Sequence, residues 1–156
     1  KRTQLSQSLI STGFPFRKGD NFQAYLAMMG EVMQRTAGLR RPGAAALDLA
    51  YVAAGFTDGF FETGLSPWDV AAGSLLVTEA GGLVGNFTGE PEFMEHKECL
   101  AGNPRIYGQL VPILHKYSKF AGAGEKAQAR QNAEKLSLPG SASSEAGDER
   151  DQGNFE

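Results

Sequence analysis

The 156-residue sequence is poor in the residues that usually build disulfides and nitrogen- or sulfur-ligated metal sites, with one cysteine, two histidines and one tryptophan. The single cysteine, Cys99, excludes a disulfide within the chain and is in keeping with a reducing cytoplasm. His96 and His115 lie too far apart in sequence for a metal-ligand spacing. We therefore expect both histidines to be surface residues rather than metal ligands.

Long apolar runs and an excess of positive charge are also absent. No apolar stretch reaches the ~18–20 residues that span a bilayer, and the opening KRTQLSQSLI has no apolar core typical of a secretory signal. The net charge of −3 argues against bulk electrostatic binding to nucleic acid. We therefore expect a cytoplasmic globular protein that does not act at a membrane.

The negative charge is concentrated at the C-terminal end. Residues 121–156 hold seven acids and four bases, so they carry the whole net charge. Apart from alanines, their apolar side chains are Leu136, Leu138 and Phe155, too few to offset the entropy of ordering the chain. We therefore expect one folded domain over residues 1–120 and a disordered acidic tail over residues 121–156. Within that tail EKAQARQNAEKL can form a transient helix.

Residues 1–120 alternate between strand and helix patterns, which predicts an α/β fold with a sheet flanked by helices. Strands are expected at SQSLISTGF, DGFFE, GGLVGNF and ECLAGN. Helices are expected from Asp20 or Asn21 to Gly38, across GAAALDLAYVAAG, from Ser66 and from Pro104. Because GAAALDLAYVAAG is apolar on nearly every side, it predicts a buried helix rather than a surface helix.

The stretch SPWDVAAGSLLVTEAGG, residues 66–82, allows two interpretations of its aspartate. Ser66 and Pro67 are typical of a helix start, and Asp69 at the third helical position can accept hydrogen bonds from free backbone N–H groups. Helix capping therefore explains Asp69 completely. Asp69 also follows Trp68, and a carboxylate held at a helix N-terminus beside a rigid indole can bind a hard cation such as Mg²⁺. The pattern alone favours the cap.

The same stretch resembles the C-terminal signature of the inositol monophosphatase family, W-D-x-A-A-G followed by E-A-G-G. STGFPF, LRRPGAAALDLAYVAAG, DGFFETGLSPWD and CLAGNPRI follow the order and spacing of the bacterial SuhB-like branch, so the resemblance covers residues 8–118. It implies the C-terminal half of a layered αβαβα sugar-phosphatase fold. It also implies a Mg²⁺-dependent, lithium-sensitive phosphomonoesterase that hydrolyses inositol monophosphate with a metal-activated water.

The resemblance assigns roles to seven residues. It implies that Asp69 is the catalytic metal ligand and also contacts the ring hydroxyls of the substrate, and that Glu62 binds an inositol hydroxyl. It places Gly43, Ala44, Ala45 and Arg40 at the substrate and Arg41 at the contact of a homodimer. Without the resemblance, Glu62 as a solvated strand-end acid and Arg40 with Arg41 as an ordinary solvated pair remain open.

One family motif is missing. The family's other metal ligands come from an N-terminal half with a D-P-[IL]-D-G-T motif, and the nearest stretch here, TDGFFE, lacks the preceding Asp-Pro. We therefore expect this chain to be the C-terminal portion of a longer enzyme and to be inactive alone. Two alternatives remain: a partner of RNA polymerase and Nus factors in transcription antitermination, or a related sugar-phosphate or 3′-phosphonucleotide phosphatase. In the first of these the acidic tail could dock on a basic partner.

Overall fold

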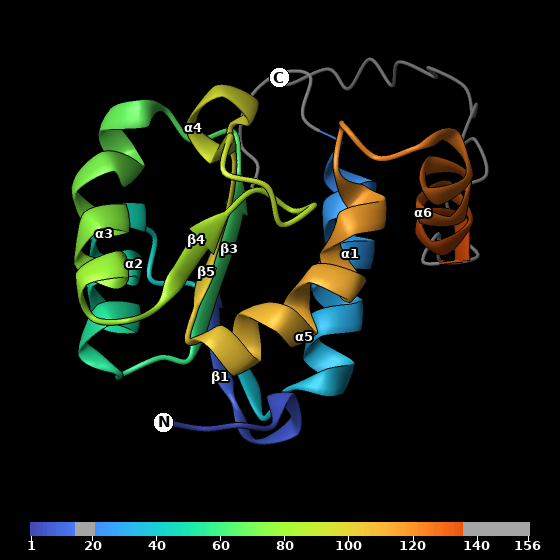
Figure 1. Cartoon of the computed structure of the whole chain (residues 1–156). Helices are drawn as coiled ribbons and strands as arrows, with labels where there is room; N and C mark the ends of the chain where they lie inside the picture. Colours follow the sequence, from blue (N-terminus) through green and yellow to red (C-terminus); the bar gives the residue numbers. More distant parts are fainter. Residues whose placement is uncertain (15–20, 136–156) are drawn as a thin grey trace, which may run out of the picture.

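Five strands form one mixed sheet in the computed structural model, which describes residues 1–14 and 21–135 (Figure 1). Their order is β2-β1-β3-β5-β4. The bounds are Leu9–Thr12 for β1, Gly38–Arg40 for β2, Gly59–Thr63 for β3, Leu83–Gly85 for β4 and Glu98–Gly102 for β5. β1 pairs in parallel with β2 and β3, whereas β5 is antiparallel to β3 and β4. The α/β fold with a mixed sheet is thus confirmed.

Helices cover both faces of the sheet (Figure 1). α1 (Phe22–Arg35) and α5 (Pro104–Leu114) lie on one face, and α2 (Ala45–Ala54) and α3 (Pro67–Glu79) lie on the other. The shorter helices are η1 (Leu5–Gln7), α4 (Phe93–His96) and η2 (His115–Tyr117), and α6 (Ala123–Lys135) lies outside α1. None of the described helices has the length and apolar character needed to cross a membrane.

Side-chain caps fix the predicted starts of α1 and α5. Asn21 Oδ1 accepts a hydrogen bond from Ala24 N–H at 3.0 Å, and Asn103 Oδ1 accepts one from Ile106 N–H at 3.1 Å. The end of α1 differs from the prediction, because the helix stops at Arg35 and Gly38 opens β2 instead. Ala37 N–H donates to the Ser8 carbonyl at 3.0 Å, which draws the chain toward β1 before Gly38 is reached.

The core has two halves because neighbouring residues of a strand point to opposite faces. Phe61 packs toward α1 and α5, and Phe60, the residue before it, packs toward α2 and α3; both are fully buried. Cys99 belongs to the second half and is 1% exposed, so it is a core residue.

The prediction that α2 is a buried helix is wrong for this chain. Leu49 is fully buried, but Leu47 is 53% and Tyr51 38% exposed on the outer side of the helix. Leu75 and Leu76 of α3 are likewise 60% and 51% exposed. The pattern is apolar on all sides, yet none of the described residues covers the outer side.

α6 differs from the expectation for residues 121–156. The helix packs against α1 through Ala129 and Ala133, which are 7% and 9% exposed. Asn132 Nδ2 donates to Glu31 Oε1 at 2.8 Å and contacts the Tyr117 hydroxyl at 3.3 Å. The small alanines let α6 approach α1 closely, which composition alone did not reveal. Residues 123–135 therefore pack against α1 as a helix. The rest of the predicted tail, residues 136–156, lies outside the described residues, and the boundary at residue 120 stays a prediction.

Candidate functional site

The candidate site lies at the carboxyl ends of the three parallel strands. β1, β2 and β3 end at one edge of the sheet, and the helices that follow β2 and β3 begin there. The chain leaves β1 toward β2 on one side and leaves β3 toward β4 and β5 on the other. Such a reversal between neighbouring strands opens a crevice, the usual ligand position in open α/β sheets. The site residues inferred from the sequence come from these strand ends and helix starts.

Asp69 lies in the first turn of α3 and is half-buried. Its Oδ2 accepts a hydrogen bond from Ser66 N–H at 2.8 Å, which is part of a capping box. Its Oδ1 has no hydrogen-bond partner among the residues that the structure describes. Capping therefore occupies one carboxylate oxygen and leaves the other available, so the two roles of Asp69 are compatible. Trp68 beside it is 81% exposed.

Glu62 on β3 lies directly against the end of β1. A Cβ atom built on Gly13 would lie 2.1 Å from Glu62 Oε1, so a side chain at position 13 would displace the carboxylate. Behind it, the Tyr25 hydroxyl is 2.6 Å from Thr12 Oγ1, which donates to the Phe61 carbonyl at 2.7 Å. Burial raises the pKa of Tyr25; the bond with Thr12 opposes this and the charge of Glu62 adds to it. Tyr25 thus stays protonated and donates toward Thr12.

The turn before α2 leaves backbone N–H groups open at the same edge. Gly43 has φ +97°, and a Cβ there would be 2.9 Å from Arg41 Nη1, so a side chain is disfavoured for two reasons. Ala44 is the N-cap and offers no side-chain acceptor. Within the described part of the chain, the first N–H groups of α2, starting with Ala45, therefore lack a side-chain cap and could bind an anion or a hydroxyl.

The two arginines lie at the outer side of this edge. Arg40 ends the edge strand β2 and is exposed, with Nη1 donating to the neighbouring Leu39 carbonyl at 3.0 Å. The Arg41 guanidinium carbon lies 5.0 Å from the centre of the Phe14 ring. Asp69, Glu62 and the Gly43–Ala45 turn therefore lie at one edge of the sheet. The Arg40 side chain instead bonds to the backbone of its own strand.

Asp48 is a buried acid near this edge that the sequence reasoning missed. It lies in the first turn of α2 with no exposed surface, and neither carboxylate oxygen has a partner among the described residues. Burial raises its pKa from the ordinary 3.8 to about 6, against the nearby Ser11 hydroxyl and Arg41 guanidinium. The available signal was a single acid inside the apolar run GAAALDLAYVAAG.

The acids that are present fit a hard cation in part. Among residues 1–14 and 21–135, no three histidine, cysteine, aspartate or glutamate side chains come together as a metal site. The Oδ1 atom of Asp69 is the donor type that Mg²⁺ prefers, held in place by the bond to Ser66. The described residues thus offer one carboxylate oxygen of this donor type, and a metal site would need further ligands.

The fold and the position of the site define a class of protein. It is a mixed α/β domain in which carboxylates and a helix start without a side-chain cap lie at the carboxyl ends of parallel strands. A profile of the inositol monophosphatase family matches residues 1–119. The chain belongs to the inositol monophosphatase family, and its similarity is to the SuhB branch within it.

Individual relatives support the branch. The chain is 52% identical over 118 residues to the Nus factor SuhB of Pseudomonas aeruginosa, covering 74% of this chain and 44% of that protein. It is 52% identical over 107 residues to the Nus factor SuhB of Escherichia coli K12, covering 69% of this chain and 40% of that protein. The chain therefore spans less than half the length of these curated relatives.

Solved structures show the same fold. The extragenic suppressor protein suhB of Bartonella henselae superimposes with a TM-score of 0.69 at 46% identity, over 72% of this chain and 43% of that one. The inositol monophosphatase of Anabaena sp. PCC 7120 gives a TM-score of 0.64 at 39% identity, over 72% and 45% of the two chains.

Proposed function

We propose that this chain is the C-terminal portion of a Mg²⁺-dependent phosphomonoesterase that hydrolyses inositol monophosphate to inositol and phosphate. The observation that carries the proposal is the joint position of Asp69, Glu62 and the uncapped start of α2 at the carboxyl ends of β2 and β3. Membership of the inositol monophosphatase family supports the substrate class.

Each group at the edge has a role that its geometry allows. Asp69 would hold Mg²⁺ through Oδ1 while Oδ2 stays bonded to Ser66. Bound there, Mg²⁺ would supply Lewis-acid activation of a water and neutralisation of charge on the phosphate. Glu62 would accept a hydrogen bond from a sugar hydroxyl, and the turn at Gly43, Ala44 and Ala45 would donate N–H groups.

The rest of the site would come from a part of the longer protein outside this chain. The outer side of α2 and α3 supports this idea, because Leu47, Leu75 and Leu76 are exposed there and no charged side chain lies between Asp69 and Glu79. α2 and α3 pack against each other, and soluble monomers seldom expose large apolar patches. A covering element on this side would also approach the N-terminus of α3, where Asp69 lies.

The test compares two variants in the longer protein. Asp69→Asn should nearly abolish turnover, because it removes a metal-binding charge. Glu62→Gln should raise KM more than it lowers kcat, because Glu62 would contact the sugar and not the metal. The measurement is phosphate release from inositol 1-phosphate across a Mg²⁺ series. Wild-type activity of Asp69→Asn at low Mg²⁺ would contradict the proposal and leave Asp69 as a cap.

A second function is favoured by the names of the relatives, because the proteins 52% identical to this chain are called Nus factors. We propose as the alternative that the longer protein acts with RNA polymerase and Nus factors in antitermination. That role needs a surface rather than a metal site, so Asp69→Asn should leave read-through of a terminator unchanged in a reconstituted transcription assay. Loss of phosphatase activity with intact read-through would separate the two roles.

The proposal includes a homodimer with Arg41 at its contact. Arg41 is exposed and lies against Phe14, so a flat cationic and aromatic pair is presented at the outer edge of the sheet. Arg41→Gln should weaken self-association of the longer protein in sedimentation velocity, whereas Arg105→Gln, an exposed arginine on α5, should not. Equal association of all three proteins would exclude Arg41 from the contact.

A further inference from the structure

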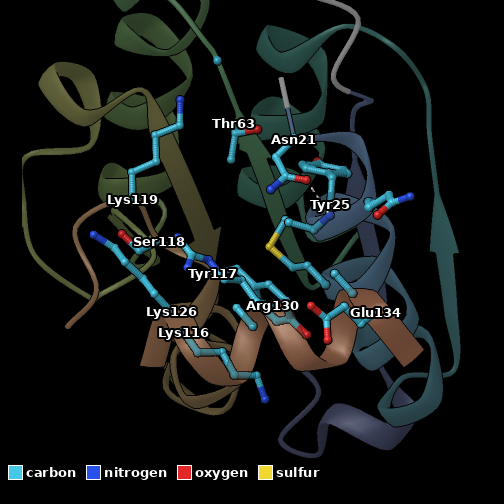
Figure 2. Close-up of a pocket in the computed structure, with 16 residues that line it drawn as sticks. Asn21, Tyr25, Thr63, Lys116, Tyr117, Ser118, Lys119, Lys126, Arg130 and Glu134 are labelled. Atoms are coloured by element: carbon cyan, nitrogen blue, oxygen red, sulfur yellow. Dashed lines mark hydrogen bonds between the residues drawn. The ribbon is translucent and has the colours of Figure 1, made fainter. Parts of the chain in front are cut away.

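A cavity of about 530 Å³ lies between α6 and the elements that precede it in the chain. Its walls come from the first half of α1, the end of β3, the segment 116–119 and one side of α6. In Figure 2, Asn21 and Tyr25 lie on one side, and Ser118, Lys119 and Lys126 lie on the other. Ligand sites typically measure ~300–1,000 Å³, so the cavity has room for a small molecule.

The floor of the cavity is apolar and its rim is basic. Met28 is 1% exposed at the floor, and Ala129 and Ala133 of α6 are nearly as buried. Four basic residues and one acid, Glu134, line the cavity. A ligand that matches both parts carries negative charge at one end and an apolar or aromatic body at the other.

Three of the four cations lack an ion-pair partner among the residues that the structure describes. Lys116 forms an ion pair with Glu31 Oε2 at 2.8 Å. The side chains of Lys119, Lys126 and Arg130 form no ion pair or hydrogen bond with any residue in the described ranges. Lys126 and Arg130 are four residues apart on one helix, a spacing at which like charges repel and destabilise the helix. An anion bound between them would relieve that repulsion.

The cavity is distinct from the candidate site but adjoins it. α6, which carries Lys126 and Arg130, begins at Ala123, beyond residues 1–119 that the family profile matches. Thr63 and Gly64 of the opposite wall directly follow Glu62. Gly64 has φ +77° and its N–H donates to the Lys97 carbonyl at 2.7 Å, which holds this wall in place.

We propose that this cavity binds a nucleotide, with its phosphates between Lys119, Lys126 and Arg130 and its base over the apolar floor at Met28. A nucleotide combines several negative charges with a flat, weakly polar body, the two features that the rim and the floor match. Arginine and lysine together suit phosphate oxygens, because the guanidinium gives directed hydrogen bonds and the ammonium gives a compact charge.

The test is calorimetric titration of the full 156-residue chain with ATP in a buffer without divalent cations. We expect one molecule of ATP to bind per chain, with a Kd below about 1 mM. The double variant Lys126→Gln/Arg130→Gln should weaken binding by about tenfold or more, because two charge-assisted contacts are lost. The matched control Arg35→Gln/Arg105→Gln removes two exposed cations outside the cavity and should bind like wild type. Far-ultraviolet circular dichroism checks that both variants are folded.

Two further ligands test the two ends of the cavity separately. Inorganic triphosphate, which lacks the base, should bind more weakly than ATP, and adenosine, which lacks the charge, should not bind measurably. Absence of ATP binding to wild type would overturn the proposal. Equal weakening in the control double variant would overturn it too, because the binding would then depend on the overall charge of the chain and not on the cavity. Triphosphate binding as tight as ATP would exclude the apolar floor and so the nucleotide class.

Discussion

Two helices on opposite faces of the sheet, α5 and α3, are built differently. In α5, Ile106, Leu110 and Leu114 form one fully buried stripe, and polar side chains such as Gln109 face outward. In α3, Val70 and Val77 face the sheet, yet Leu75 and Leu76 are exposed on the other side. An amphipathic helix is a surface helix, whereas one that is apolar all round is suited to burial on both sides. The comparison supports the proposal that α2 and α3 form an inner layer, covered on both sides, in the longer protein.

Polar substitutions on the uncovered layer should have the largest effect, and only in the longer protein. Leu47→Gln/Leu75→Gln should cost about 4 kcal/mol there, because two apolar side chains would be buried by the cover. In the 156-residue chain the same change should stay within about 0.5 kcal/mol, as for exposed sites generally. Urea denaturation measures both.

The matched control lies on the other layer. Phe22 and Met33 of α1 are 55% and 58% exposed, so Phe22→Gln/Met33→Gln should be nearly neutral in both proteins. If the longer protein tolerates Leu47→Gln/Leu75→Gln as well as this control, the idea of an inner layer is wrong.

Glycine-to-alanine changes should have opposite signs in the two layers. A Cβ on Gly73 of α3 would lie 2.6 Å from Leu49 Cβ, so Gly73→Ala should push α2 from α3 and cost about 2–3 kcal/mol. No atom lies within 4 Å of a Cβ built on Gly30 of α1. Gly30→Ala should therefore stabilise the chain by about 0.5–1 kcal/mol through helix propensity. Thermal unfolding of the two variants gives the comparison, and a stable Gly73→Ala protein would refute the close packing.

Sequence patterns predicted most elements, because local signals agree with the fold over residues 1–120. Asn21 and Asn103 cap their helices as predicted, and the apolar strands lie where they were expected. The short strand β2 was missed, because three residues carry no periodicity and its pairing depends on β1. α6 was misjudged, because the contribution of Ala129 and Ala133 depends on the shape of α1.

The candidate site was predictable only where motifs carried it. The positions of Asp69, Glu62 and Gly43 at one edge follow from parallel strands whose order the sequence does not specify. Two features had no sequence signal strong enough to use. Asp48 has no charged partner within its own turn, and the Gly13–Glu62 contact joins residues 49 positions apart.

The buried acid of the inner layer predicts a pH dependence. Because the pKa of Asp48 is raised to about 6 from an ordinary 3.8, the folded state binds the proton more tightly than the unfolded state. Its contribution is fully present below pH 3.8 and is lost as pH rises through about 6. Asp48→Asn keeps the shape of the neutral acid, so the variant should be more stable than wild type at pH 8 by about 3 kcal/mol.

The measurement is chemical denaturation at pH 4.5 and pH 8. The stability difference between Asp48→Asn and wild type should grow with pH. A difference that is the same at both values would show that Asp48 does not titrate in this range.

The smallest effect is expected from removing α6. The helix buries two alanines and contributes the hydrogen bonds of Asn132, so a chain ending at Gly122 should lose about 1 kcal/mol. A chain ending at Lys135 should have the midpoint of the full chain within error, since α6 is kept. Thermal melts of the three lengths measure this, and an unchanged midpoint after removal of α6 would mean that its contacts with α1 add no net stability.

The central claim is that Asp69 caps α3 with one oxygen and binds a metal with the other. In the longer protein, Asp69→Asn should leave the melting temperature in EDTA equal or higher, because it removes the repulsion between Asp69 and the other metal-binding carboxylates. The rise in melting temperature on adding Mg²⁺ should be smaller than in wild type or absent. Ser66→Ala, which keeps the carboxylate, should lower the melting temperature in EDTA slightly and retain the full Mg²⁺ rise. An undiminished Mg²⁺ rise in Asp69→Asn would contradict the account and reduce Asp69 to a helix cap.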